Sequence, residues 1–309
     1  MKKLSLVIPV YFEEDCIGQF LTETIPVLEK IAMQWEIVFI DDGSLDKTTE
    51  IIKEKSKKEN RIKLIEFSYN HGKQAAVSAG IKYSTGDYII YMDPDLQDPP
   101  EEIPKFIEEI EKGYDLVFGK RLEKKDSYTN VLFSKIFWWT LEKFTGLKLP
   151  KGLAVMRIFN RKFANTFLKY SEQNRFIEGI FMHIGLKQSI ITISQRERFA
   201  GISKFNFKRK MNLAFDAIFD FSELPLKIAI KTGFYLTLMS FLALISIIIA
   251  RIFFIEFQIG WPSIIITILG STGILLIFIG ILAIYIGKLY KEIKARPLFS
   301  IKEFTNINE

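Results

Sequence analysis

Cysteine and histidine are nearly absent from this 309-residue sequence, which holds one cysteine and two histidines. Because Cys16 stands alone, an internal disulfide is excluded, and the composition fits a reducing compartment. So few cysteines and histidines also argue against a zinc site. The sequence contains neither a Gly-x-Gly-x-x-Gly nor a Gly-x-x-x-x-Gly-Lys-Ser/Thr pattern, which argues against NAD-dependent enzymes and P-loop ATPases.

Charge of one sign is only slightly in excess, since 42 Lys and Arg face 36 Asp and Glu, a formal net charge of +6. No basic stripe with a nucleic-acid-binding signature is present, so we expect no nucleic-acid partner. Much of the positive excess lies beside an apolar region, which favours a membrane surface as the partner. The apolar stretch near the N-terminus ends at Pro9 and is too short for a signal peptide.

Short apolar runs alternate with helical patterns through the first 120 residues. The runs predict buried strands at residues 4–10, 36–40, 62–67, 88–92 and 116–118, and helices are expected at about 14–32, 46–58, 72–84 and 100–112. This alternation predicts an α/β fold with a doubly wound parallel sheet. Because ligands bind at the carboxyl ends of such strands, the side chains directly after each run form the candidate site.

Residues 230–287 are almost wholly apolar and predict a hairpin of two transmembrane helices, at about 232–255 and 261–286. The shorter stretch would cover about 36 Å at 1.5 Å per residue, more than the roughly 30 Å of a hydrocarbon core. The outer flanks are rich in Lys and Arg, and the connection between the helices has neither. The positive-inside rule therefore predicts a multi-pass protein of the plasma membrane, with the α/β domain and both termini in the cytoplasm.

These patterns divide the chain into four parts. We expect a catalytic α/β domain at 1–204, juxtamembrane amphipathic helices at 205–229, the membrane helices at 230–287 and a cytoplasmic tail at 288–309. Residues 205–221 combine phenylalanines with Lys208, Arg209 and Lys210, as an interfacial helix does. The aromatic segment 131–144 fits either the membrane interface or an ordinary core. Small residues in the second membrane helix could pack against the first helix or a second copy, so a homo-oligomer stays open.

Asp93 and Asp95 directly follow the strand expected at 88–92. Carboxylates two residues apart in an extended segment project to the same side. One or two carboxylates, together with phosphate oxygens and water, suit a hard divalent cation such as Mg²⁺, which would stabilise a leaving diphosphate. The pair is therefore the candidate metal site and catalytic centre.

Asp41 and Asp42 close the second expected strand, where a carboxylate can accept hydrogen bonds from a base or a ribose. The alternative is a turn, because Asp42 and Gly43 form a turn dipeptide and Ser44 could cap the next helix. Residues 9–13 end the first strand and would form another wall of the same crevice.

These motifs, in this order, resemble family 2 glycosyltransferases of the polyprenyl-phosphate type, which are relatives of dolichyl-phosphate mannose synthase and of undecaprenyl-phosphate glucosyltransferases. The resemblance covers nearly the whole chain. It rests on residues 7–14, 41–46, 70–73, 86–87, 92–100, 119–121, 198–204, 222–226, 287–292 and 296–298.

The resemblance implies a GT-A fold, an inverting sugar transfer, Mg²⁺ or Mn²⁺ as the cofactor, a nucleotide-sugar donor with UDP favoured over GDP, and a polyprenyl phosphate acceptor in the bilayer. The candidate nucleotide-binding residues are Pro9, Val10, Tyr11, Glu13, Asp41, Asp42, Lys73 and Asp93. The candidate catalytic residues are Asp93, Asp95, Gln97 and Arg121, with Asp93 and Asp95 on the metal. Cationic and hydroxyl groups for the acceptor phosphate are Arg121, Arg157, Arg198, Ser203 and Lys204.

Two positions depart from the family pattern. Phe12 stands where the family usually has Asn, and Val155 stands where an Asp is proposed as a base or metal partner in some relatives. A phosphate monoester has its second pKa near 6, so the acceptor is largely a dianion at pH 7 and needs little help from a base. Two alternatives are a processive polysaccharide synthase, which residues 195–199 suggest, and a non-catalytic membrane scaffold that lost activity with Val155. One sugar per lipid, a polymer or no product would distinguish the three.

Overall fold

The computed structural model describes residues 2–121, 152–173, 175–197, 199, 224–253 and 260–307. The chain forms two compact units. The sheet unit comprises Met1–Glu142, Leu147–Arg209 and Pro297–Glu309, and the helical unit comprises Lys143–Gly146 and Lys210–Arg296.

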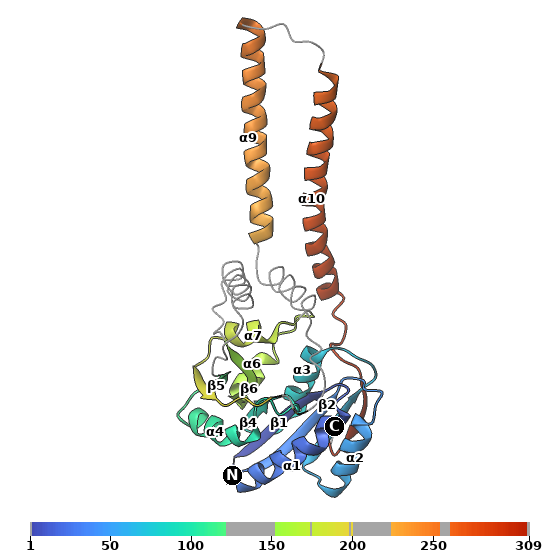
Figure 1. Ribbon diagram of the computed structural model, residues 1–309, viewed down its shortest axis with the longest axis vertical. Coiled ribbons are helices and arrows are strands. Elements are labelled where there is room, and N and C mark those ends of the chain that lie inside the picture. The colour runs from blue at the N-terminus through green and yellow to red at the C-terminus, as the bar shows by residue number, and fades with distance from the viewer. Residues whose placement is uncertain are drawn as a thin grey trace. The chain divides into compact units, whose positions relative to one another are not determined.

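Eight strands in the described residues form a single mixed sheet in the order β7-β5-β6-β4-β1-β2-β3-β8 (Figure 1). The central strands run parallel. Their order, β3-β2-β1-β4, is typical of nucleotide-binding α/β folds. The strands span Lys3–Val10 (β1), Gln34–Asp41 (β2), Ile62–Phe67 (β3), Tyr88–Tyr91 (β4), Leu116–Arg121 (β5), Leu153–Asn160 (β6), Gln188–Ile193 (β7) and Ile301–Thr305 (β8).

The five predicted strands are confirmed, and the fold class is α/β as expected. These five strands run in one direction as expected, but the sheet is mixed, because β6 runs antiparallel to both β4 and β5, and β8 runs antiparallel to β3. Neither β6 nor β8 was among the predicted strands.

Helices cover both faces of the sheet (Figure 1). On one face lie α1 (Glu14–Lys30), α2 (Thr48–Lys58) and α4 (Ile103–Glu111), which the short 3₁₀ turn η1 (Pro100–Glu102) precedes; on the other lie α3 (Lys73–Tyr83), α6 (Arg161–Phe167) and α7 (Ile177–His183). Leu4 and Leu6 of β1 join one apolar core with α1 and α4. On the opposite face, α3 approaches the sheet closely at Gly80, where an added Cβ would come within 2.3 Å of Val7 and 2.6 Å of Ile40. The alternating side chains of the strands are therefore buried on both sides.

The last described residues, which lie in the predicted cytoplasmic tail at 288–309, return to the sheet. α10 (Trp261–Ile293) continues past residue 288, and the chain from Pro297 on belongs to the sheet unit. There β8 pairs with β3, with Ile301 opposite Phe67. A five-residue strand whose partner lies far away in the sequence leaves little periodic signal, which is why the pattern did not reveal it.

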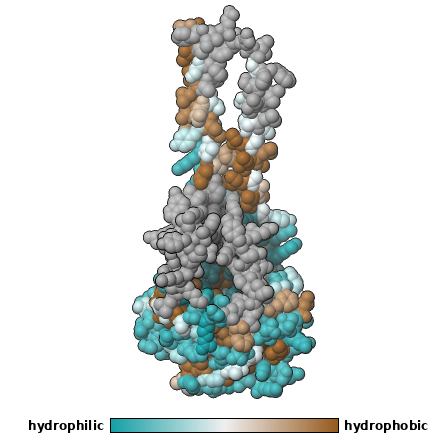
Figure 2. All heavy atoms as spheres, viewed as in Figure 1, coloured by the Kyte–Doolittle hydropathy of each residue, from teal (hydrophilic) through white to brown (hydrophobic). Residues whose placement is uncertain are grey.

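The helical unit contains two long helices within the described residues, α9 (Leu224–Phe253) and α10. They contact one another, since a Cβ at Gly233 would lie 3.7 Å from the Phe278 ring. The stretch Gly270–Ile293 of α10 is long and apolar enough to cross a membrane, and Figure 2 shows brown, hydrophobic side chains on these helices. This stretch overlaps the second predicted membrane helix. The membrane span at 232–255 stays a prediction, as do the interfacial segments at 131–144 and 205–221, which lie outside the described residues.

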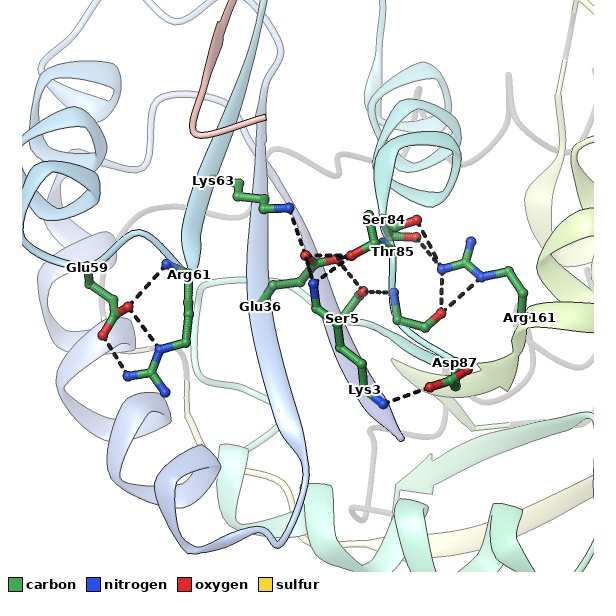
Figure 3. A network of polar contacts seen from close by, with 11 residues as sticks. Lys3, Ser5, Glu36, Glu59, Arg61, Lys63, Ser84, Thr85, Asp87 and Arg161 are labelled. Atoms are coloured by element: carbon green, nitrogen blue, oxygen red, sulfur yellow. Dashed lines mark hydrogen bonds and ion pairs between the residues drawn. The ribbon is translucent and has the colours of Figure 1, made fainter. Parts of the chain in front are cut away.

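A buried polar network fastens the starts of β1 and β2 (Figure 3). Glu36 is 1% exposed. Its carboxylate accepts hydrogen bonds from Ser5 Oγ at 2.6 Å and from the Thr85 amide at 2.7 Å. Two ammonium groups also reach it, Lys3 Nζ at 2.7 Å and Lys63 Nζ at 2.9 Å. Burial alone would raise the pKa of Glu36, but these donors outweigh it and lower the pKa to about 2. The network lies at the amino ends of the strands, opposite the edge where ligands are expected.

Candidate active site

The segments after β1 and β2 are bonded together at the carboxyl edge of the sheet. The Asp42 amide donates to the Val10 carbonyl, and the Phe12 amide donates to Ser44 Oγ, both at 3.0 Å. Phe12 has a φ of 53°, in the left-handed region, and its ring centre lies 4.4 Å from that of Tyr11. This edge therefore brings together the predicted residues Pro9, Val10, Tyr11, Glu13, Asp41 and Asp42.

Asp41, the last residue of β2, is 2% exposed and lines an open pocket of about 360 Å³. Its Oδ2 accepts hydrogen bonds from the Ser44 amide at 3.0 Å and from Thr49 Oγ1 at 3.3 Å. Its Oδ1 is buried and has no hydrogen-bond partner among the described residues. Burial raises the pKa of Asp41. A buried carboxylate oxygen without a donor costs free energy, so an N–H group of a bound ligand would stabilise it.

Asp42 holds the loop that precedes α3. Its Oδ1 accepts a hydrogen bond from the His71 amide at 2.6 Å, and its Oδ2 accepts from the Gly72 amide at 2.9 Å and Asn70 Nδ2 at 3.0 Å. Burial raises the pKa of Asp42 to about 6, although the two amide hydrogen bonds oppose this shift. Both carboxylate oxygens are thus occupied by the protein. The predicted cap at Ser44 is not formed, since α2 begins after Lys47. The contact of Asp42 with a nucleotide stays a prediction.

Lys73 and Asp93 form an ion pair that joins the start of α3 to the end of β4. Lys73 Nζ lies 2.6 Å from Asp93 Oδ2. The two side chains are 47% and 22% exposed, so a ligand in solvent can reach both. The sequence motifs proposed both residues for donor binding but gave no sign that they touch.

Asp95 and Gln97 lie in the turn that follows. Asp95 is 5% exposed, and its Oδ1 accepts a hydrogen bond from the Gln97 amide at 3.1 Å. The segment after β7 lies against this turn, because the Arg196 amide donates to the Gln97 carbonyl at 3.0 Å and the Phe199 amide to the Asp95 carbonyl at 3.2 Å. The turn that carries Asp95 is thereby held between β4 and the chain that follows β7.

Asp98, to which no role was assigned from the sequence, ties three parts of the sheet together around this turn. Its Oδ1 accepts hydrogen bonds from Arg121 Nε at 3.0 Å and Nη2 at 2.8 Å. Its Oδ2 accepts from the amides of Val155 and Met156, both at 3.0 Å. Arg121, a predicted catalytic and acceptor-binding residue at the end of β5, is thus oriented by the Asp98 carboxylate. The one sequence signal was a third acidic residue soon after Asp95.

Arg157 lies in the protein interior and is 2% exposed. Its guanidinium carbon is 5.3 to 5.5 Å from the ring centres of Tyr91, Phe118 and Phe181. Glu178 Oε1 lies 3.6 Å from Nη2, and Nη1 has no hydrogen-bond partner among the described residues. A phosphate could reach this guanidinium only if the covering side chains moved, so its contact with the acceptor stays a prediction. The other predicted acceptor residues, Arg198, Ser203 and Lys204, lie outside the described residues.

Two carboxylates fit a divalent cation that is shared with a diphosphate. Within the part of the chain that the structure describes, no group of three or more His, Cys, Asp or Glu side chains is placed to hold a metal. Mg²⁺ and similar ions need only one or two carboxylates when phosphate oxygens and waters complete the shell. A cation already stands at this position, since the Lys73 ammonium contacts Asp93. Asp93 and Asp95 stay the predicted residues for such an ion.

The family model for glycosyl transferase family 2 matches residues 5–167, more than half of the chain. The matched residues include Asp41 and the turn from Asp93 to Asp98. The chain belongs to this family.

Relatives of this family 2 glycosyltransferase align over nearly its full length. An uncharacterized glycosyltransferase of Synechocystis is 34% identical over 303 residues, which cover 97% of this chain and 95% of the relative. The bactoprenol glucosyl transferase of Shigella phage SfX is 36% identical over 301 residues, covering 97% and 99%. A prophage bactoprenol glucosyl transferase homolog of Escherichia coli K12 is also 36% identical over 301 residues, covering 97% and 98%.

The fold of this glycosyltransferase is shared with solved enzymes. Glucosyl-3-phosphoglycerate synthase from Mycobacterium tuberculosis, solved with Mn²⁺, UDP-glucose and phosphoglyceric acid, matches with a TM-score of 0.50 at 14% identity, covering 70% of this chain and 79% of that chain. The sheet unit therefore has a GT-A fold, a Rossmann-like mixed sheet with helices on both faces. The predictions of the fold and of the family are confirmed.

Proposed function

We propose that this family 2 glycosyltransferase moves one sugar from a nucleotide-sugar to a polyprenyl phosphate, with inversion at the anomeric carbon. The observation that carries the proposal is the pair Asp93 and Asp95 at the carboxyl end of β4, where the fold binds ligands. The full-length likeness to proteins named bactoprenol glucosyl transferase supports a lipid-linked acceptor.

The donor nucleotide would lie at the carboxyl ends of β1 and β2. Asp41 Oδ1 is buried without a hydrogen-bond donor among the described residues, so one ring N–H of a base would satisfy it. Uracil presents one such N–H, whereas guanine presents a ring N–H together with an amino group. Either base can supply that donor, and the resemblance to the polyprenyl-phosphate type of this family favours UDP over GDP. Pro9, Val10, Tyr11 and Glu13 would form the other wall.

Asp93 and Asp95 would hold Mg²⁺ or Mn²⁺, which supplies positive charge to the departing nucleoside diphosphate. The protein's own groups orient the donor around this point. Lys73 brings an ammonium group to Asp93, and Gln97 lies next in the same turn, where the sugar would bind. Asp98 fixes the position of the Arg121 guanidinium relative to this turn through two hydrogen bonds.

In the transfer, a phosphate oxygen of the acceptor attacks the anomeric carbon while the bond from that carbon to the diphosphate oxygen breaks. The acceptor is largely a dianion at pH 7, because its second pKa is near 6, so a protein base is not required and Val155 is compatible with activity. Cationic side chains must offset the repulsion between acceptor and donor phosphates. Of the proposed acceptor residues, the structure describes Arg121 and Arg157. Arg121, 24% exposed, is the more accessible of these two, and Arg198, Ser203 and Lys204 complete the proposed set.

We place the reaction at the cytoplasmic face of the plasma membrane. The apolar stretch Gly270–Ile293 supports membrane association. Basic residues follow it at Lys294 and Arg296, on the side that the positive-inside rule assigns to the cytoplasm. Two membrane spans and a cytoplasmic sheet unit are part of the proposal.

A transfer assay tests the function. Full-length protein in detergent is incubated with undecaprenyl phosphate, Mg²⁺ or Mn²⁺, and each of a panel of UDP- and GDP-sugars, and the lipid product is weighed by mass spectrometry. We expect one sugar per lipid phosphate, from a UDP-sugar, with loss of product in a chelator. A polymer would point to a processive synthase. No product from any donor, with folded protein, would point to a non-catalytic scaffold. Either result contradicts the proposal.

A further inference from the structure

The loop of residues 68–72, between β3 and α3, is held from two sides. On the β2 side it is anchored by Asp42, which accepts hydrogen bonds from two of its amides. It also packs directly on Gly43, where an added Cβ would come within 2.8 Å of the Tyr69 backbone. Gly43 has a φ of 78°, so both its conformation and the space around it require glycine.

On its other side the loop is held by the segment that leads into β8. The Ser68 amide donates to the Ser300 carbonyl at 2.9 Å. In return, the Ser300 amide donates to His71 Nε2 at 3.1 Å. The Phe299 ring stacks on the Phe67 ring, with centres 5.3 Å apart and planes within 4°. The His71 ring is further packed between Phe67 and Tyr69, at 5.4 and 4.0 Å.

This loop sets the start of α3. It ends at Gly72, whose φ of 92° marks the sharp entry into the helix, and the next residue is Lys73, whose ammonium contacts Asp93. The same segments line the pocket at Asp41, since its wall includes Ser68 and, from β8, Lys302. Residues 299–305 therefore touch the candidate site at two points, the pocket wall and the loop that presents Lys73.

We propose that residues 299–305, which follow the helical unit in the chain, help to form the binding site for the nucleoside diphosphate. His71 is a positioning residue: its hydrogen bond from Ser300 holds the loop of residues 68–72 and thereby the position of Lys73. The proposal rests on the proposed function, because it assigns these residues to binding of the sugar donor. It predicts that loss of the bond between Ser300 and His71 weakens donor binding without affecting the acceptor.

The test compares two substitutions of His71 in the full-length protein. His71→Phe keeps a flat ring for Phe67 and Tyr69 but cannot accept the Ser300 amide. His71→Gln is the matched rescue, because its side-chain oxygen is an acceptor with about the same reach. The measurements are the affinity for UDP with Mn²⁺ by calorimetry, the KM for UDP-sugar and for polyprenyl phosphate, kcat, and the thermal midpoint.

We expect His71→Phe to weaken UDP binding and raise the donor KM about fivefold, the effect of one net hydrogen bond. We expect kcat, the acceptor KM and the thermal midpoint to change little, and His71→Gln to return the donor KM to within about twofold of the wild type. A merely structural role would lower the thermal midpoint and would not separate the two KM values.

A second pair of variants, at Ser300, tests the same hydrogen bond in case His71→Phe does not fold. Ser300→Pro removes the N–H donor, whereas Ser300→Ala keeps it and loses only the hydroxyl, so only the first should weaken UDP binding. Wild-type UDP affinity in either His71→Phe or folded Ser300→Pro would overturn this inference alone. Failure of the wild-type protein to bind any nucleoside diphosphate would overturn the proposed function and this inference with it.

Discussion

The contact between Lys73 and Asp93 joins a cation to the carboxylate that is proposed to hold a metal ion. Nζ and Oδ2 lie 2.6 Å apart, and both side chains are partly exposed. A divalent ion that binds Asp93 has to displace this ammonium or share the carboxylate with it. The displaced ammonium would then be next to the donor diphosphate. The ion pair therefore holds Lys73 close to the place where the diphosphate is proposed to bind.

Lys73→Gln should therefore raise the affinity for Mn²⁺ alone, because the competing cation is gone. A partly exposed ion pair contributes at most about 1 kcal/mol, so we expect the increase to be about threefold. The measurement is a titration of free Mn²⁺ by electron paramagnetic resonance in the absence of nucleotide. Lys112→Gln makes the same charge change at a surface pair with Glu109 and serves as the control. Unchanged or weaker Mn²⁺ binding in Lys73→Gln would mean that the two cations do not compete.

At the scale of single residues, the sequence predicted where Asp41, Asp93 and Asp95 would lie, because each follows an apolar run and parallel strands end at one edge. It did not predict what Asp98 and His71 do. Their roles depend on hydrogen bonds to residues far away in the chain, Arg121 for the first and Ser300 for the second. Such partners are set by tertiary packing, and residue type and spacing carry no sign of them.

At the scale of elements, the strands and helices of the first 121 residues could be read from apolar periodicity, since each is an uninterrupted buried run or a helical pattern. The antiparallel strands β6 and β8 could not. β6 inserts between β4 and β5, and β8 adds to the edge at β3. Sheet order is decided by pairings between distant segments, and local pattern does not determine them.

The network around Glu36 makes the stability of the sheet unit depend on pH. The pKa of Glu36 is about 2 in the folded protein against an ordinary value of 4.5, so the folded state favours the ionised form. The stabilisation, about 3 kcal/mol, is complete above pH 4.5 and is lost as the pH falls toward 2. Its physical source is the set of donors from Ser5, Thr85, Lys3 and Lys63.

Glu36→Gln should consequently lower the free energy of unfolding at neutral pH, and the difference from the wild type should shrink as the pH falls from about 4.5 to about 2. Urea unfolding followed by near-ultraviolet circular dichroism measures both. Glu54→Gln replaces an exposed carboxylate on α2 and should leave the unfolding free energy close to that of the wild type. A difference between Glu36→Gln and the wild type that stays constant across this pH range would show that Glu36 does not titrate as described.

For the whole molecule, composition alone separated a charged α/β region from an apolar one, and the division between the sheet unit and the helical unit follows that contrast. Composition could not show that the chain leaves the helical unit at residue 297 and rejoins the sheet as its eighth strand. The pocket at Asp41 is thus lined by residues of β2 and β3 and by Lys302 of β8, from near the other end of the described chain.

The central claim is that the carboxylates after β4 carry the transfer of a sugar to a polyprenyl phosphate. The most direct measurement is the rate of that transfer at saturating Mn²⁺ for the wild type, for Asp95→Asn and for Asp87→Asn, which alters a carboxylate just before the amino end of the same strand. We expect Asp95→Asn to lose about 100-fold or more in kcat, because leaving-group charge is no longer stabilised, and Asp87→Asn to stay close to the wild type. Wild-type transfer by Asp95→Asn would contradict the assignment of this site.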